Sequence, residues 1–118
     1  MATATKKYIL RFRAVNKRTL EDLKSGRKKV ETRAATVKYR GIKKGDKIIL
    51  ACGKTRFETT VKHSSIFKSI SAMLRKYKVQ DIMPELSLRD ELERIYFSYP
   101  NYREKIKKFG LIALELRK

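Results

Sequence analysis

The chain has 118 residues, of which 42% are hydrophobic and 36% are charged, and its formal net charge at pH 7 is +19. This length and apolar content predict one globular domain with its own core, and they exclude a two-domain protein and an intrinsically disordered one. No apolar run is long enough to span a bilayer, and the first residues lack the apolar segment of a secretory signal. We therefore expect a cytoplasmic protein without a membrane partner, in which residues 1–6 are a flexible leader.

The positive charge is concentrated in the first two-thirds of the sequence. Residues 1–80 contain 23 Lys and Arg against 5 Asp and Glu, whereas residues 81–118 contain 8 against 7. A basic surface of this kind attracts polyanions and speeds their association, and no basic amphipathic helix favours a membrane surface. We expect a nucleic acid partner. Two simpler explanations of the charge stay open, namely a generally basic proteome and the solubility that excess lysine provides.

The chain is expected to begin with a strand and a short helix. Apolar side chains alternate with others over residues 8–13, which predicts a half-buried strand that turns Arg11 and Arg13 outward. Asn16 is then a candidate N-cap, and Gly26 is a candidate C-terminal stop for the helix.

The stretch SGRKKVETR, residues 25–33, follows this helix. As a strand it turns Lys29, Glu31 and Arg33 to one face. Ion pairs on a wet face are the simpler interpretation. In a concave site, however, Glu31 stays ionised among so many cations and orients Lys28 or Arg33, while Lys28 loses its proton more readily. Lys28 reaches the same face as Glu31 only if the turn bends the chain.

Residues 34–46, AATVKYRGIKKGD, are expected to form an exposed, irregular and very basic segment. Tyr39 lies between two cations there, where it either stacks on an unpaired base or packs against its own loop. Together with the stretch before it, this segment supplies most of our candidate nucleic-acid-binding residues. These are Arg11, Arg13, Arg27, Lys29, Arg33, Lys38, Tyr39, Arg40, Lys43 and Lys44.

A β-hairpin is predicted next, with strands at residues 48–52 and 57–61 joined by a Gly53-Lys54 turn. Cys52 is the only cysteine, and its apolar neighbours predict a buried, unreactive thiol. His63 is the only histidine. The sequence therefore offers no ligand set for zinc, and we expect neither a metal nor a cofactor.

Three helices are expected after the hairpin. Ser64 or Ser65 caps the first, whose apolar stripe reaches Tyr77 and is assigned to the core. The second begins at Ser87 and stops before Pro100.

The third helix opens with a capping box of Asn101 and Glu104 and ends at Gly110. Residues 111–116 then form a closing strand. This order of elements is not the strict alternation of a doubly wound sheet. It predicts an α+β fold, a small and mostly antiparallel β-barrel with surrounding helices.

These residues resemble the ASCH domain family, which belongs to the PUA-like class of small barrels. The resemblance covers nearly the whole chain from Lys7, so residues 7–118 are expected to be one ASCH-like domain. It implies a cleft beside the barrel, suited to RNA or to a modified nucleoside. The matching residues are Gly26, Lys28, Glu31 and Arg33, which fit the pattern G-x-K-x-x-E-x-R, together with IKKGDKIIL and the ending FGLIALEL.

The resemblance also implies possible activities. Some small ASCH proteins are amidohydrolases that remove the acetyl group of N4-acetylcytidine, and others are linked to RNA cleavage. The amidohydrolases have a threonine nucleophile where this chain has Glu31, which can act only as a base toward water. The amidohydrolases also use a glutamate, and Glu85 is the residue of this chain that corresponds to it most nearly.

Three functional hypotheses follow. In the leading one the protein is an RNA-binding module whose cleft residues Lys28, Glu31 and Arg33 hold a base, although the residues alone do not separate RNA from DNA. In the second it is a hydrolase of RNA or of a modified nucleoside, with Lys28 and Glu31 catalytic and with Glu85 and Tyr102 as secondary candidates. In the third it is an adaptor whose residues 81–118 dock a protein partner.

Overall fold

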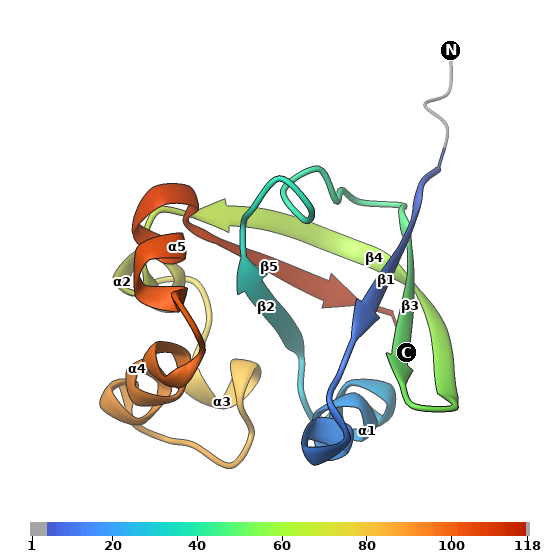
Figure 1. The fold of residues 1–118 in the computed structure, drawn as a ribbon, viewed down its shortest axis with the longest axis horizontal. Coiled ribbons are helices and arrows are strands. Elements are labelled where there is room, and N and C mark those ends of the chain that lie inside the picture. Colours follow the sequence, from blue (N-terminus) through green and yellow to red (C-terminus); the bar gives the residue numbers. More distant parts are fainter. Residues whose placement is uncertain (1–4, 118) are drawn as a thin grey trace.

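The computed structural model describes residues 5–117 and has a mixed α+β fold. Its five-stranded sheet, in the order β1-β3-β4-β5-β2, curls into a half-barrel (Figure 1). β1 and β3 are parallel, and the other neighbouring pairs are antiparallel, as predicted for most of the sheet. The strands are β1 (Lys7–Arg11), β2 (Val30–Ala34), β3 (Lys47–Cys52), β4 (Thr55–Phe67) and β5 (Leu111–Leu116).

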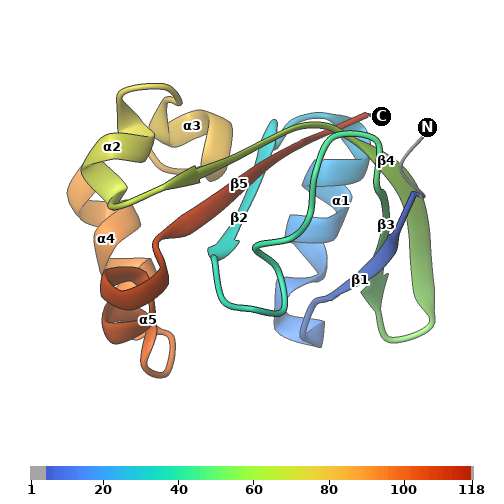
Figure 2. The ribbon, with the colours of Figure 1, turned by 90° about the horizontal axis from the view of Figure 1, so that it is seen from above.

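The helices form two groups on either side of the central strands, as Figures 1 and 2 show together. One group is α1 alone, which a short 3-10 turn (Ala14–Asn16) precedes. The other contains the four helices between β4 and β5. The helices are α1 (Lys17–Ser25), α2 (Ile70–Leu74), α3 (Val79–Ile82), α4 (Arg89–Ser98) and α5 (Tyr102–Phe109). None of the helices within residues 5–117 has the length and apolar composition needed to cross a membrane.

Two hydrophobic clusters fill the molecule, and β5 contributes to both. Successive side chains of a strand point to opposite faces of the sheet. Ile112 and Leu114 accordingly join the cluster beside α1, while Leu111 and Ala113 join the cluster beneath α2 to α5. Because β5 is covered on both faces, its first four residues, 111–114, are all apolar and buried rather than alternating.

The predicted helix is present as α2, but its predicted cap at Ser64 or Ser65 is wrong. β4 continues to Phe67, and Ser65 and Ile66 pair with β5 instead of starting a helix. The helix begins only at α2, where the Ser69 side chain accepts a hydrogen bond from the Ala72 N–H at 3.1 Å. A short apolar run fits both strand and helix periods, and here the pairing needs of β5 decide the outcome.

The predicted capping box at the start of α5 is also wrong. Asn101 has φ of 59°, in the left-handed region, and its side chain makes no capping hydrogen bond. Asparagine tolerates this conformation better than most residues. Asn16 likewise makes no capping bond, although Gly26 ends α1 in the left-handed conformation as predicted.

Most of the predicted leader, residues 1–6, lies outside the described residues. Its last residue is held by the sheet. The Lys6 N–H donates to Asp46 Oδ1 at 3.1 Å, and the Lys6 carbonyl accepts from the Lys47 N–H at 2.9 Å.

Candidate functional site

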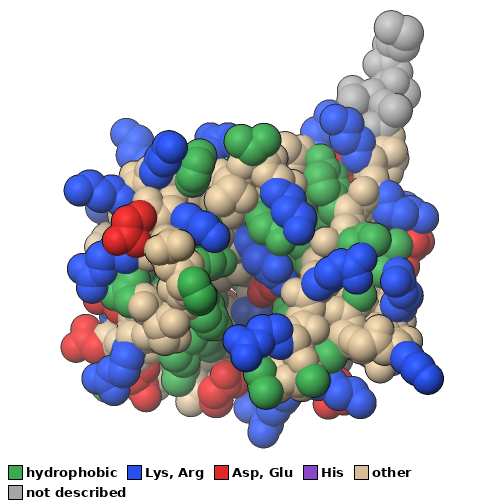
Figure 3. Space-filling model, viewed as in Figure 1, with side chains coloured by type: hydrophobic (Ala, Val, Ile, Leu, Met, Phe, Trp, Pro, Cys, Tyr) green, Lys and Arg blue, Asp and Glu red, His purple; other side chains and the backbone are tan. Residues whose placement is uncertain are grey.

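A cavity opens between the two helical groups, with β2 as its floor. Its volume is about 110 Å³, which is room for a small planar group or several waters but not for a polymer. Figure 3 shows a hollow near the centre of this face, with basic side chains around it. The cavity is lined by three parts of the chain, which are Phe12, Asn16, Thr19 and Asp22; Lys28, Glu31, Thr32 and Arg33; and Ile82 to Glu85 with Tyr96, Tyr99 and Tyr102.

A turn after α1 brings Lys28 to the same side as Glu31. Gly26 takes φ of 85°, which side chains with a Cβ rarely adopt. The chain then folds back, so that the Lys28 N–H donates to the Asp22 carbonyl at 2.9 Å. The bend that the sequence left open is therefore present, and it places Lys28 beside Glu31.

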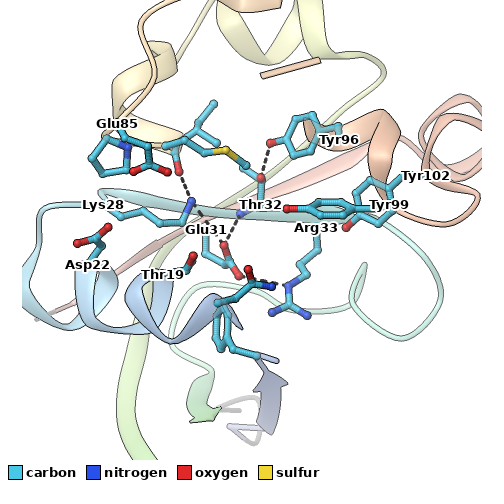
Figure 4. Close-up of a pocket in the computed structure, with 15 residues that line it drawn as sticks. Thr19, Asp22, Lys28, Glu31, Thr32, Arg33, Glu85, Tyr96, Tyr99 and Tyr102 are labelled. Carbon is cyan, nitrogen blue, oxygen red and sulfur yellow. Dashed lines mark hydrogen bonds and ion pairs between the residues drawn. The ribbon is translucent and has the colours of Figure 1, made fainter. Parts of the chain in front are cut away.

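Lys28 is buried, with 5% of its surface exposed, and its ammonium group has two partners. Its Nζ donates to the Ile82 carbonyl and lies 3.6 Å from Glu31 Oε1 (Figure 4). Burial lowers the pKa of Lys28 below its usual value, and the Glu31 carboxylate only partly offsets this.

Glu31 joins Lys28 to Arg33. It is buried as well, and its Oε1 accepts the Thr32 N–H at 3.2 Å, while its Oε2 accepts Arg33 Nε at 3.2 Å. These contacts make a chain of cation, carboxylate and cation in which Lys28 and Glu31 are buried and Arg33 is half-buried. The wet-face interpretation of this stretch is therefore wrong for Glu31, because both faces of β2 are covered.

The guanidinium of Arg33 is held between two rings and a carbonyl. Its Cζ lies 5.1 Å from the Phe12 ring centre and 5.5 Å from that of Tyr39. Its Nη2 donates to the Arg11 carbonyl at 3.3 Å. Burial works to lower the pKa of Arg33, but Glu31 and the nearby tyrosines raise it above its usual value.

Three tyrosines form one wall of the cavity. Tyr96 shares a hydrogen bond with the Thr32 hydroxyl, and the Tyr102 hydroxyl accepts the Ala34 N–H at 3.1 Å. Tyr99 packs edge-on against Tyr102, with ring centres 5.1 Å apart. Burial raises the pKa of all three phenols, so they are neutral donors at physiological pH.

The charge of this cavity is unlike that of the whole chain. Its described lining contains two cations, Lys28 and Arg33, and three carboxylates, Asp22, Glu31 and Glu85. Asp22 is itself buried, and its Oδ1 accepts Arg27 Nη1 at 3.2 Å. A phosphate would meet these carboxylates without extra cations to offset them. The interior is better suited to a neutral or cationic group that donates hydrogen bonds.

The structure brings together all four predicted catalytic candidates. Lys28 and Glu31 meet, and Glu85 and Tyr102 line the same cavity. Lys29 does not, so the predicted common face of Lys29, Glu31 and Arg33 is wrong. Its side chain is 72% exposed and lies 3.9 Å from Asp81, because β2 begins only at Val30 and the turn leaves Lys29 outside the cavity.

Most of the predicted nucleic-acid-binding residues are exposed, and of this set only Arg33 lines the cavity. Tyr39 is half-buried between Arg33 and Lys38, so it packs against its own loop. Arg40 donates to the Ala35 carbonyl at 2.9 Å. The remaining exposed cations of this set are Arg11, Arg13, Arg27, Lys29, Lys38, Lys43 and Lys44.

Several lining residues were missed by the sequence analysis. Asp22 and Thr19 are three residues apart on α1 and share a face, and a carboxylate beside the buried Leu23 is the signal that could have indicated them. Thr32 and Tyr96 were not among the predicted site residues. Their hydrogen bond joins residues 64 positions apart, and no local pattern predicts such a contact.

The one cysteine and the one histidine of the chain, which were considered as metal ligands, do not line this cavity. Cys52 is buried, as predicted, and its Sγ donates to the Arg13 carbonyl at 3.6 Å. His63 is exposed beside Ser65 and Lys76. Among residues 5–117, no cluster of three His, Cys, Asp or Glu side chains could hold a metal ion.

No protein-family model and no curated protein matches the chain. Two solved structures are similar over 94% of it. The crystal structure of hypothetical protein PH0355 has 30% sequence identity and a TM-score of 0.81, with 97% of that chain covered. The solution NMR structure of protein PF0455 from Pyrococcus furiosus has 25% identity and a TM-score of 0.73, with 96% covered. Given this identity over almost the full length of both chains, the protein belongs to the same family as hypothetical protein PH0355.

Proposed function

We propose that the protein is an RNA-binding domain of the ASCH type, within the PUA-like class, and that its cavity holds one unpaired base. The observation that carries this proposal is a small, tyrosine-walled cavity rich in carboxylates inside a chain of net charge +19. The exposed Lys and Arg residues hold phosphates outside the cavity, while the cavity itself receives an uncharged ring.

The polar groups of the cavity support a base that presents N–H donors. A carboxylate has about four lone-pair sites, so Glu31 keeps accepting capacity beside its contacts with Lys28, Thr32 and Arg33. Tyr99 and Tyr102 offer hydroxyl donors and ring faces from the opposite wall (Figure 4). Sequence-specific proteins read unpaired bases by this combination of stacking and edge contacts.

Titration with free nucleosides tests this proposal, because they carry no phosphate and report on the cavity alone. We expect at least one nucleoside to bind, and Glu31→Gln to weaken its binding about tenfold, since a charged acceptor contributes about 1.5 kcal/mol. Tyr99→Phe is the second variant, because Tyr99 is 37% exposed and we expect removal of its hydroxyl to leave the fold intact. Glu58→Gln, which removes an exposed carboxylate of β4, is the control. Absence of binding by every nucleoside would overturn the proposal.

A hydrolase is the second candidate, and the lowered pKa of Lys28 next to Glu31 favours it. In the hydrolysis of an acylated base, Glu31 would take a proton from water as the oxygen joins the acyl carbon. The carbon–nitrogen bond then breaks, and the base nitrogen receives the proton.

Mass spectrometry of a cellular RNA pool after incubation with the protein tests this second candidate. Both chain length and modified-nucleoside content would be followed. Lys28→Ala should abolish any change, whereas Lys29→Ala, which removes the neighbouring exposed lysine, should not. A change that persists in Lys28→Ala would overturn the assignment of Lys28, and the absence of any change with the original protein would exclude the hydrolase and leave the binding proposal alone.

A further inference from the structure

A second and larger concavity shares Lys28 with the first. Its volume is about 590 Å³, within the range of ligand-binding sites. It lies where the end of α1, the middle of β4 and the end of β5 meet, and Leu23, Gly26, Lys29, Lys62, Glu115 and Arg117 line it beside Lys28. We call it the basic groove. We call the cavity above β2, described in the previous subsections, the base cavity. The base cavity and the basic groove share only Lys28 among their described lining residues.

The basic groove carries an excess of unpaired positive charge. Its described lining contains four cations and one carboxylate. That carboxylate, Glu115, accepts the Tyr77 hydroxyl at 2.5 Å and forms no ion pair within residues 5–117. Lys62 and Arg117 are exposed and have no ion-pair partner in the same part of the chain. Like charges gathered in a hollow raise the local concentration of anions.

A break in the sheet ladder aims Lys62 at this groove. Val61 pairs with Leu116 and His63 pairs with Glu115, so the register shifts across Lys62. Such an extra residue re-aims a side chain relative to a regular strand. The Arg117 N–H donates to the Thr60 carbonyl at 3.0 Å, which fixes the end of β5 beside the shift. The two cations are therefore positioned by the backbone rather than scattered.

We propose that the basic groove binds backbone phosphates of a single RNA strand, with Lys29, Lys62 and Arg117 as the contacting residues. Arg117 can hold a phosphate through two parallel hydrogen bonds, and the two lysines act as point charges. The identification of the strand as RNA rests on the proposed function. The anion-binding chemistry rests on the groove alone.

The test measures binding of a short mixed-sequence single-stranded RNA over a series of salt concentrations. The double variant Lys62→Gln/Arg117→Gln should bind at least tenfold more weakly at low salt. Each lost phosphate contact on a single strand lowers the slope of log K against log salt by about 0.7, so we expect a loss of about 1.4 from the slope. The matched control is Lys54→Gln/Lys105→Gln, which removes two exposed cations outside the groove.

The outcomes separate the groove from the base cavity. A slope change confined to the groove variant supports the proposal, whether or not free nucleosides bind. Equal slope changes in both double variants, or none in either, overturn it. Inorganic tripolyphosphate, which has no base, should bind the protein and the Tyr99→Phe variant equally and bind the groove variant at least tenfold more weakly. If tripolyphosphate binds the original protein and the groove variant with the same affinity, the groove is not an anion site.

Discussion

The base cavity and the basic groove show two opposite ways of using positive charge. In the base cavity, Lys28 is buried and Arg33 is half-buried, and Glu31 pairs with both, with a second and a third carboxylate nearby. In the basic groove, Lys62 and Arg117 are exposed, and no carboxylate within residues 5–117 pairs with them. The net charge of +19 therefore describes the surface of the molecule and not its best-formed cavity.

The largest expected effect comes from removing the carboxylate of the base cavity. Glu31→Ala leaves the buried Lys28 and the half-buried Arg33 without their carboxylate, which should cost about 3 kcal/mol or more of the free energy of unfolding. Urea denaturation measures this loss. Glu58→Ala removes a carboxylate whose partner Lys7 lies 3.3 Å away on the surface, and it should cost at most about 1 kcal/mol. Similar losses in the two variants would show that the chain of charges does not stabilise the fold.

The next effect concerns pH. Burial lowers the pKa of Lys28 in the folded protein from its usual 10.5. Between the lowered value and 10.5 the unfolded chain binds more protons at this site, so Lys28 makes stability rise with pH, by at most about 1.4 kcal/mol per pH unit. Lys28→Met should remove this rise in urea denaturation carried out between pH 7 and about pH 9.5, below the ordinary pKa of tyrosine.

Lys29→Met is the control for this pH dependence, because Lys29 is the exposed neighbour of Lys28. The free energy of unfolding of Lys29→Met should change with pH as that of the original protein does. An unchanged pH dependence in Lys28→Met would mean that the buried ammonium remains charged throughout this range.

A smaller effect is expected at the aromatic wall. Tyr96→Phe leaves the Thr32 hydroxyl without its buried partner, which should cost about 1–2 kcal/mol. Thr32→Val should cost a similar amount, but the double variant should cost about 1 kcal/mol less than the sum of the two, because no polar group is then left unpaired. Additive losses in denaturation experiments would exclude a coupled pair.

The smallest effect separates the groove from the cavity. Lys62→Gln should change the free energy of unfolding by less than about 0.5 kcal/mol, since Lys62 is exposed and without an ion-pair partner in residues 5–117. Relief of repulsion within the basic groove should make the change stabilising at low salt. A clear destabilisation would show that Lys62 supports the β4 register shift rather than a ligand.

The sequence predicted the parts of the fold that depend on local signals. Alternation in β1, the stop at Gly26 and the buried thiol of Cys52 are all confirmed. The region around Ser64 failed because its local pattern suits two structures and a distant strand, β5, selects one of them. Local pattern and distant pairing therefore have to agree before a strand end can be predicted.

The candidate site was predicted only where it is local in sequence. Lys28, Glu31 and Arg33 lie within one short stretch, and the turn at Gly26 brings them together. The opposite wall comes from the Ile82 carbonyl and the tyrosines of α4 and α5, more than 50 residues later. The carboxylate excess inside the cavity could not be inferred, because it depends on which charges the fold buries. RNA binding and ASCH membership remain predictions.

The double burial of β5 bears on how the protein is made. This strand pairs with both β2 and β4 and contributes to both hydrophobic clusters. Because translation proceeds from the N-terminus, residues 111–116 emerge from the ribosome after the other helices and strands of residues 5–117. Until then β2 has no partner strand within residues 5–117, and the floor of the base cavity cannot form. The nascent chain would thus carry most of its positive charge well before it can discriminate among ligands.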